Sequence, residues 1–243
     1  MRPPRREGPR ADQKKKSYLD TVLKVLEAHN ASTTSALVEV NLLVSIDRRE
    51  TAEEARVTVE LARAAKEAGR PVVGIDLSGN PALGKNAMLT YGDALSLARA
   101  AGLRTTLHFA EVDNPEEVGA MLEWGPDRLG HAVCLGAAQK EVLFEAGIPV
   151  EICLTSNKIT ESVASYADHH LGEFLERRHP VSICTDDSGV FETTSAREHA
   201  IAAATFGLSE AELLRLSRAA VDQTFAGAAT KARLRAVFDA FAM

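Results

Sequence analysis

Five titratable side chains follow short apolar segments of the sequence, and their types are those that activate water. They are His108, Glu111, His131, Asp186 and Asp187. Imidazole and carboxylate groups bind divalent metals in hydrolases, and a bound metal lowers the pKa of a water molecule toward neutrality. A neighbouring carboxylic acid and imidazole then transfer protons. The set therefore predicts metal-assisted hydrolysis.

Each of these residues also has an ordinary structural explanation when it is taken alone. His108 and His131 can be buried histidines bonded to neighbouring groups, and Glu111 can be a first-turn acid favoured by a helix dipole. Asp186 and Asp187 can be a helix N-cap and its solvated neighbour. Together these explanations would place two imidazoles and three carboxylates in one apolar-walled pocket. That arrangement is costly unless the groups bind a cation or do chemistry, so we favour the functional interpretation.

The segments that carry these residues alternate with helical patterns, which predicts a parallel α/β sheet covered on both faces. The predicted strands are 38–46, 72–77, 105–109, 128–133, 150–154 and 181–185. The predicted helices are 17–29, 53–68, 91–101, 115–124, 137–146, 168–178, 195–206, 209–219, 220–225 and 230–242. Ligands of parallel α/β folds bind at the carboxyl ends of the strands. The polar groups that end successive strands therefore indicate one shared site.

Composition separates a short N-terminal segment from the rest of the chain. Residues 1–16 hold seven Lys or Arg residues against Glu7 and Asp12, whereas all 243 residues together carry a net charge of −6. We interpret residues 1–16 as a basic flexible arm, with a nucleic-acid tail or an Arg-rich transit peptide as the alternatives. Ser17 is interpreted as the N-cap of the first helix, and residues 17–243 as one barrel domain. The negative net charge excludes a protein built mainly to hold nucleic acid. Without an apolar leader or a run of about 18 apolar residues, we expect no membrane partner and a cytosolic location.

Four motifs occur in the order and approximate spacing of the adenosine deaminases. They are Leu107-His108-Phe109-Ala110-Glu111, Leu129-Gly130-His131, Cys153-Leu154-Thr155-Ser156-Asn157 and Cys184-Thr185-Asp186-Asp187, preceded by Gly74-Ile75-Asp76-Leu77-Ser78-Gly79. Over about residues 36–228 the sequence therefore resembles the adenosine deaminase family, which implies a (β/α)8 TIM-type barrel. Within that family it is most similar to the adenosine-deaminase-like proteins that act on N6-methyl-AMP, as the stretches 154–157, 168–170 and 186–191 indicate.

The resemblance implies a role for each matched titratable residue. His108 and Asp186 are implied as ligands of one zinc ion, and Glu111 as the proton donor to the purine ring nitrogen beside the attacked carbon. His131 is implied to orient and deprotonate the zinc-bound water and to stabilise the oxyanion. The implied reaction converts a purine nucleotide, N6-methyl-AMP, to IMP and methylamine. For the full-length form we expect a monomer.

Other residues have weaker implied roles. Asp187 and the backbone of Gly79 are implied as contacts to the purine. After the first predicted strand, either Arg48 or Arg49 can face a phosphate, with a solvated loop as the alternative. The adjacent histidines 169–170 we interpret as the polar start of the predicted helix 168–178.

The sequence departs from the family pattern at one point. The family's first strand carries His-x-His and provides two zinc ligands, but none of the seven histidines here forms that motif. A catalytic zinc normally has three protein ligands, so His108 and Asp186 alone predict an incomplete site. With about six of eight strands and extra C-terminal helices, we expect an incomplete barrel that lacks the family's N-terminal part. The alternative functions are an inactive remnant that binds or regulates at most, or an open barrel completed by another chain.

Overall fold

The computed structural model describes residues 11–32, 38–83 and 86–241, and its centre is one six-stranded sheet. The strands are β1 (Leu42–Asp47), β2 (Val72–Ser78), β3 (Arg104–Phe109), β4 (Arg128–His131), β5 (Val150–Ile152) and β6 (Val181–Ile183). They lie in sequence order, and every neighbouring pair is parallel. No pairing between β1 and β6 is present among the described residues, so the sheet is not closed. The predicted six-stranded, incomplete barrel is therefore confirmed.

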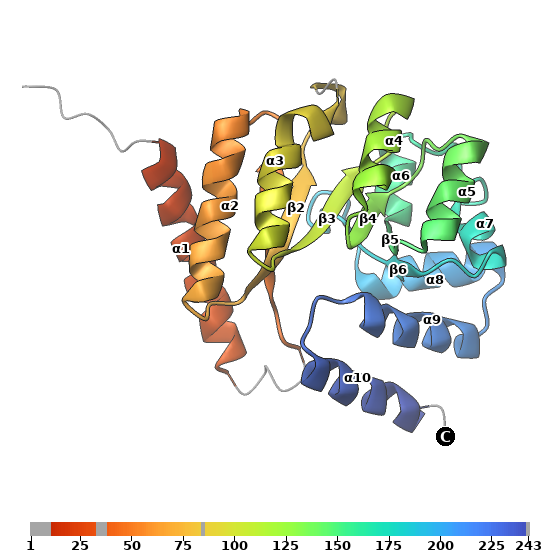
Figure 1. Cartoon of the computed structure of the whole chain (residues 1–243). Helices are drawn as coiled ribbons and strands as arrows, with labels where there is room; N and C mark the ends of the chain where they lie inside the picture. Colours follow the sequence, from red (N-terminus) through yellow and green to blue (C-terminus); the bar gives the residue numbers. More distant parts are fainter. Residues whose placement is uncertain (1–10, 33–37, 84–85, 242–243) are drawn as a thin grey trace, which may run out of the picture.

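Helices line the outer face of the sheet and the region beyond its amino ends (Figure 1). The outer helices are α1 (Ala11–Asn30), α2 (Ala52–Glu67), α3 (Ala87–Ala100), α4 (Pro115–Trp124) and α5 (Ala137–Ala146). The later helices are α6 (Leu154–Ile159), α7 (Leu171–Glu176), α8 (Ser195–Phe206), α9 (Glu210–Gln223) and α10 (Ala228–Phe241). Packing joins α9 to β6 and α10 to α9. None of the described helices is both long enough and apolar enough to cross a bilayer.

The two faces of the sheet differ in chemistry. Ile75, Leu77 and Leu107 are fully buried in the apolar core that includes the outer helices. Successive strand residues point to opposite faces, so Asp76 and His108 lie on the inner face and line a cavity. The prediction of a sheet covered by apolar packing on both faces is therefore wrong for the inner face. Polar residues are scattered singly through the apolar segments, and the strand period collects them on one side.

The first helix begins at Ala11 rather than at the predicted N-cap Ser17. Residues 11–16 therefore belong to α1 and not to a flexible arm. Lys15 forms an ion pair with Glu50 at 2.8 Å and donates a hydrogen bond to Thr58 at 3.0 Å. These partners are distant in sequence, so a local pattern does not indicate them. Residues 1–10 of the predicted arm lie outside the described residues.

Three other predicted boundaries are corrected. β5 ends at Ile152, and the last residues of the predicted strand 150–154 lead into α6. Glu198 of α8 accepts a hydrogen bond from the Thr155 backbone N–H at 3.1 Å, which satisfies one donor at the start of α6. The predicted helix 168–178 shortens to α7, and the predicted helices 209–219 and 220–225 form the single helix α9.

A buried ion pair joins the loop after β1 to the first turn of α4, at the carboxyl ends of the strands. Arg48 is 6% exposed and Glu117 is 6% exposed, and their side chains make two hydrogen bonds of 2.8 and 3.0 Å. Arg48 also donates to the backbone carbonyl of His108 at 3.1 Å, and Glu117 accepts from the Ala87 N–H at 2.8 Å. Neither a phosphate contact nor a solvated loop describes Arg48, because its guanidinium is buried and paired with Glu117. The exposed Arg49 bonds to Asp47 instead.

We predict that Arg48→Ala lowers the free energy of unfolding by about 3–5 kcal/mol, because it leaves the Glu117 carboxylate buried without its partner. Arg49→Ala is the matched control, since it removes the adjacent arginine from an exposed pair, and it should leave the free energy of unfolding almost unchanged. Urea denaturation of the two variants measures both values. Equal stabilities of the two variants would contradict the role given to the Arg48–Glu117 pair.

Candidate active site

The carboxyl ends of the strands open into one cavity of about 1010 Å³. The residues proposed from the sequence as catalytic, metal-binding or purine-binding all line it, namely Gly79, His108, Glu111, His131, Asp186 and Asp187. They come from the ends of β2, β3, β4 and β6 or from the residues that follow these strands. The parallel register thus brings together side chains that are spread over more than a hundred positions of the sequence.

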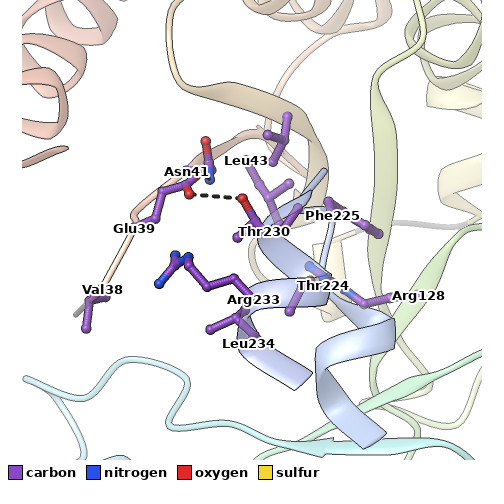
Figure 2. A pocket seen from close by; sticks show the side chains of 12 residues that line it. Val38, Glu39, Asn41, Leu43, Arg128, Thr224, Phe225, Thr230, Arg233 and Leu234 are labelled. Carbon is purple, nitrogen blue, oxygen red and sulfur yellow. Dashed lines mark hydrogen bonds between the residues drawn. The ribbon is translucent and has the colours of Figure 1, made fainter. Parts of the chain in front are cut away.

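A second pocket, of about 420 Å³, lies beside the amino ends of the strands (Figure 2). It is formed between the chain that enters β1 and the start of α10, where Thr230 donates a hydrogen bond to Glu39 at 3.3 Å. Arg128 in its wall pairs with Glu151 at 2.6 Å and stacks on Phe225. None of the predicted site residues lines this pocket. The cavity at the carboxyl ends is therefore the candidate active site.

Three side chains of the cavity can hold a metal ion. One ligand atom from each of His108, His131 and Asp186 lies within 4.8 Å of the others. Nδ1 of His108 is 3.1 Å from Asp76, which leaves Nε2 of His108 for a ligand. Ser156 donates a hydrogen bond to Asp186 at 2.7 Å and orients that carboxylate. Imidazole nitrogen and carboxylate oxygen suit a divalent metal such as zinc, so the residues fit one.

The two imidazoles of this group have opposite electrostatic environments. Burial disfavours the charged form of His108, but the hydrogen bond to Asp76 and the charges of three nearby carboxylates outweigh burial and raise its pKa to about 9. Burial and the nearby charge of His108 lower the pKa of His131 to about 4. The two ring centroids are only 5.1 Å apart. At neutral pH without a metal, His108 is therefore protonated and positively charged, while His131 is neutral.

Glu111 has the environment of a proton donor. Burial raises the pKa of its carboxyl group, opposed by the charges of His108 and Arg48. Its Oε1 atom is buried and has no hydrogen-bond partner in the described part of the chain. The other oxygen, Oε2, lies 3.8 Å from Nε2 of His131. A carboxyl group with a raised pKa and an unpartnered oxygen in a cavity is suited to general acid catalysis.

Unusual backbone conformations mark the edge of the cavity. Ala110, His131 and Asp186 have positive φ angles of 52°, 65° and 55°, which cost of order 1–3 kcal/mol for residues with a side chain. Gly79 has a φ of 97°, and a Cβ atom there would stand 2.9 Å from Asp47 Oδ1. Only glycine fits this position without a shift. Of the three residues with a side chain, His131 and Asp186 line the cavity.

Comparison with known proteins agrees with this geometry. The family model described as adenosine deaminase matches residues 9–240. The chain belongs to the adenosine deaminase family. A relative from Arabidopsis thaliana named N6-mAMP deaminase is 47% identical over 202 residues, which are 83% of this chain and 56% of that protein. The chain thus spans little more than half the length of this relative.

Solved structures of the adenosine deaminase family match the fold over 96% of the chain. The apo structure of the N6-methyl-AMP deaminase from Arabidopsis thaliana matches with a TM-score of 0.88 at 43% identity, over 96% of this chain and 70% of that one. A crystal structure from Arabidopsis in complex with IMP matches with a TM-score of 0.87 at 41% identity, over 96% and 69% of the two chains.

Five residues of this adenosine deaminase family site had no predicted role in it. They are Asp76, Ser156, Asn157, His169 and His170. Asp76 bonds His108, Ser156 bonds Asp186, and Asn157 bonds His131 at 3.3 Å. Asp76 had a signal in the sequence as an acid between apolar residues of a strand, and Ser156 and Asn157 belong to a matched motif, but neither signal indicated these contacts. The contacts of the other four residues depend on how α6 and α7 pack.

His169 and His170 lie in surroundings that disfavour a charged imidazole, and from this we predict that the folded protein loses stability in acid. Burial lowers the pKa of His169 to about 3 and that of His170 to about 4. In the unfolded chain both imidazoles take up protons as the pH falls through 6.5. Between pH 6.5 and about 4 the unfolded state therefore binds more protons, and stability is lost as the pH falls.

We expect these two residues to add about 2.4 kcal/mol per pH unit to the fall in the free energy of unfolding between pH 6 and 5. His170→Phe keeps an aromatic ring but removes one of the two protons, so it should reduce the slope by about 1.2 kcal/mol per pH unit. Urea denaturation at a series of pH values measures the slope. An unchanged slope in His170→Phe would contradict the neutral, buried state of this ring.

Proposed function

We propose that this cavity catalyses the hydrolytic deamination of a purine nucleotide, N6-methyl-AMP, to IMP and methylamine, with one zinc ion as cofactor. The observation that carries the proposal is the unpartnered, buried Oε1 of Glu111, whose raised pKa suits an acid, beside the donor groups His108 and Asp186. The family membership supports deamination, and the Arabidopsis relatives support this nucleotide and its product.

Each residue of the site has a distinct role in the proposed reaction. His108 and Asp186 would hold the zinc ion, which when bound supplies Lewis acidity for the activation of water. Glu111 gives its proton to the purine ring nitrogen beside the attacked carbon, which makes that carbon more electrophilic. His131 faces the same space and stabilises negative charge on the added oxygen. Asp187 and the backbone of Gly79 contact the purine. Methylamine leaves as its bond to the ring carbon breaks. Of the two protons of the attacking water, one goes to the methylamine nitrogen and the other replaces the proton that Glu111 gave.

One observation favours the alternative of a chain that binds a nucleotide without turnover. The roles implied by the family leave only His108 and Asp186 as ligands, and the seven histidines include no His-x-His. Three protein ligands are usual for catalytic zinc. Zinc content measured together with conversion of N6-methyl-AMP separates the two functions. Stoichiometric zinc with production of IMP supports the enzyme. The absence of both zinc and IMP supports the alternative.

Glu111→Gln should abolish turnover of N6-methyl-AMP while the metal content stays unchanged, because glutamine has no acidic proton and Glu111 is not a ligand in the proposed site. The loss of a general acid is worth about 10²–10⁴-fold in rate. Formation of IMP by chromatography and zinc by elemental analysis are the two measurements. Turnover close to that of the unaltered chain would remove Glu111 from its proposed role.

Asp186→Ala should reduce zinc occupancy, because it removes the carboxylate of the donor group. Asp187→Ala is the matched control, since the neighbouring Asp187 lines the same cavity but contacts the purine in the proposed site. This control should keep zinc and weaken nucleotide binding. Equal zinc contents in the two variants, after dialysis against the same buffered zinc concentration, would exclude Asp186 as a ligand.

A further inference from the structure

A chain of buried hydrogen bonds runs from the backbone of α7 to the ring of His131. The Leu171 N–H donates to Nδ1 of His169 at 3.1 Å. Nε2 of His169 is 3.1 Å from Oδ1 of Asn157, and Nδ2 of Asn157 is 3.3 Å from Nδ1 of His131. The three side chains are 2–3% exposed, so water does not compete for these bonds. The donor or acceptor role of each group in this series of hydrogen bonds therefore constrains the role of the next group.

The direction of every bond in this chain follows from its first donor. A backbone N–H can only donate, so Nδ1 of His169 is an acceptor and the single proton of that neutral ring is on Nε2. Nε2 therefore donates to Asn157, whose oxygen must face His169 and whose NH2 group must face His131. Since an amide NH2 only donates, Nδ1 of His131 accepts. The proton of the neutral His131 ring is then on Nε2.

His170 holds the same residue from the other side. Its Nε2 donates to the backbone carbonyl of His131 at 2.6 Å, at the point where His131 has a φ of 65°. The rings of His169 and His170 stack with centroids 4.2 Å apart and an interplanar angle of 20°. One histidine of the pair therefore reaches the ring of His131 through Asn157, and the other bonds its strained backbone. This explains why two adjacent histidines are buried outside the donor group.

We propose that Asn157, His169 and His170 are positioning residues, which hold His131 as a neutral ring with its proton on Nε2. That atom lies 3.8 Å from Glu111 Oε2 and 3.9 Å from Asp186 Oδ2, and His131 lines the cavity. An Nε2–H group donates a hydrogen bond to an oxygen in the cavity. Through that atom it neither accepts a proton nor binds a metal.

The proposal changes two roles considered above for His131. His131 stabilises a negatively charged oxygen as a hydrogen-bond donor and does not remove the proton of the attacking water. That proton passes instead to the carboxylate that Glu111 becomes once it has protonated the purine. The proposal also means that, of His108, His131 and Asp186, only His108 and Asp186 bind the metal. The catalytic role of His131 rests on the proposed function, but the position of the proton on its ring does not. The two are therefore tested separately.

The position of the proton is measured by two-bond ¹H–¹⁵N correlation spectra of the chain labelled with ¹⁵N-histidine. The chain has seven histidines, and the signals lost in His131→Gln identify those of His131. We expect Nδ1 of His131 to be unprotonated and Nε2 to be protonated near neutral pH. A proton on Nδ1, or a doubly protonated ring, would overturn the proposal.

Asn157→Asp tests whether Asn157 determines which ring nitrogen of His131 carries the proton. A carboxylate only accepts hydrogen bonds, so the proton of His131 should move to Nδ1. The matched control is Asn114→Asp, where the side chain accepts from the Glu117 N–H as the N-cap of α4 and aspartate does the same. The control should leave the His131 signals unchanged. An unchanged proton position in Asn157→Asp, or the same change in both variants, would overturn the proposal.

His169→Phe provides an independent variant should Asn157→Asp fail to fold, as judged by circular dichroism. Phenylalanine retains the stacking on His170 but gives Asn157 no donor, so the amide is free to turn. The His131 signals should then report a mixture of the two neutral forms. A single form with the proton on Nε2 would show that the hydrogen-bond chain does not position His131.

Turnover provides the second readout. With zinc and N6-methyl-AMP, Asn157→Asp should lower kcat by about 10–100-fold, in the range of outer-shell substitutions, with a smaller change in KM. A shifted proton with unchanged kcat would overturn the catalytic part of the proposal. An unaltered chain without turnover would overturn the proposed function, and the spectra would still decide the position of the proton.

Discussion

The parallel register of the sheet is the constraint on which the site depends. All six strands run in one direction, so their carboxyl ends meet at one edge and deliver their last side chains to one cavity. Adjacent strands lie about 4.8 Å apart, and groups at neighbouring strand ends are therefore within each other's electrostatic range. His108 at the end of β3 and His131 at the end of β4 have ring centroids 5.1 Å apart for this reason.

Crowding at this edge separates the protonation states of chemically identical groups. His108 faces carboxylates and has a pKa raised to about 9, whereas burial and the charge of His108 lower that of His131 to about 4. Asp76 holds the first ring, and Asn157 holds the second. Pairs of titratable groups with opposite shifts are typical of sites that divide acid, base and ligand roles. The same set would be destabilising if the groups lacked their partners.

Side chains from distant parts of the sequence hold the backbone of this edge. Arg48 donates to the carbonyl of His108, His170 donates to that of His131, and Glu198 accepts from the N–H of Thr155. These bonds satisfy groups that strand ends and helix starts leave without partners, and they hold residues with positive φ angles in place. Precision in the site therefore depends on contacts that cross the whole described fold.

The sequence by itself determined the order and type of the elements, the incomplete six-stranded barrel, the family, and the side chains that meet in the cavity. These features follow from strand and helix periods and from motifs, which are local. Tertiary structure alone decided that Arg48 is buried against Glu117, that Lys15 lies in a helix, and that Asn157 links His169 to His131. Each of these depends on partners brought together by packing. Hydrogen-bond direction and proton position are properties of such contacts, so no local pattern carries them.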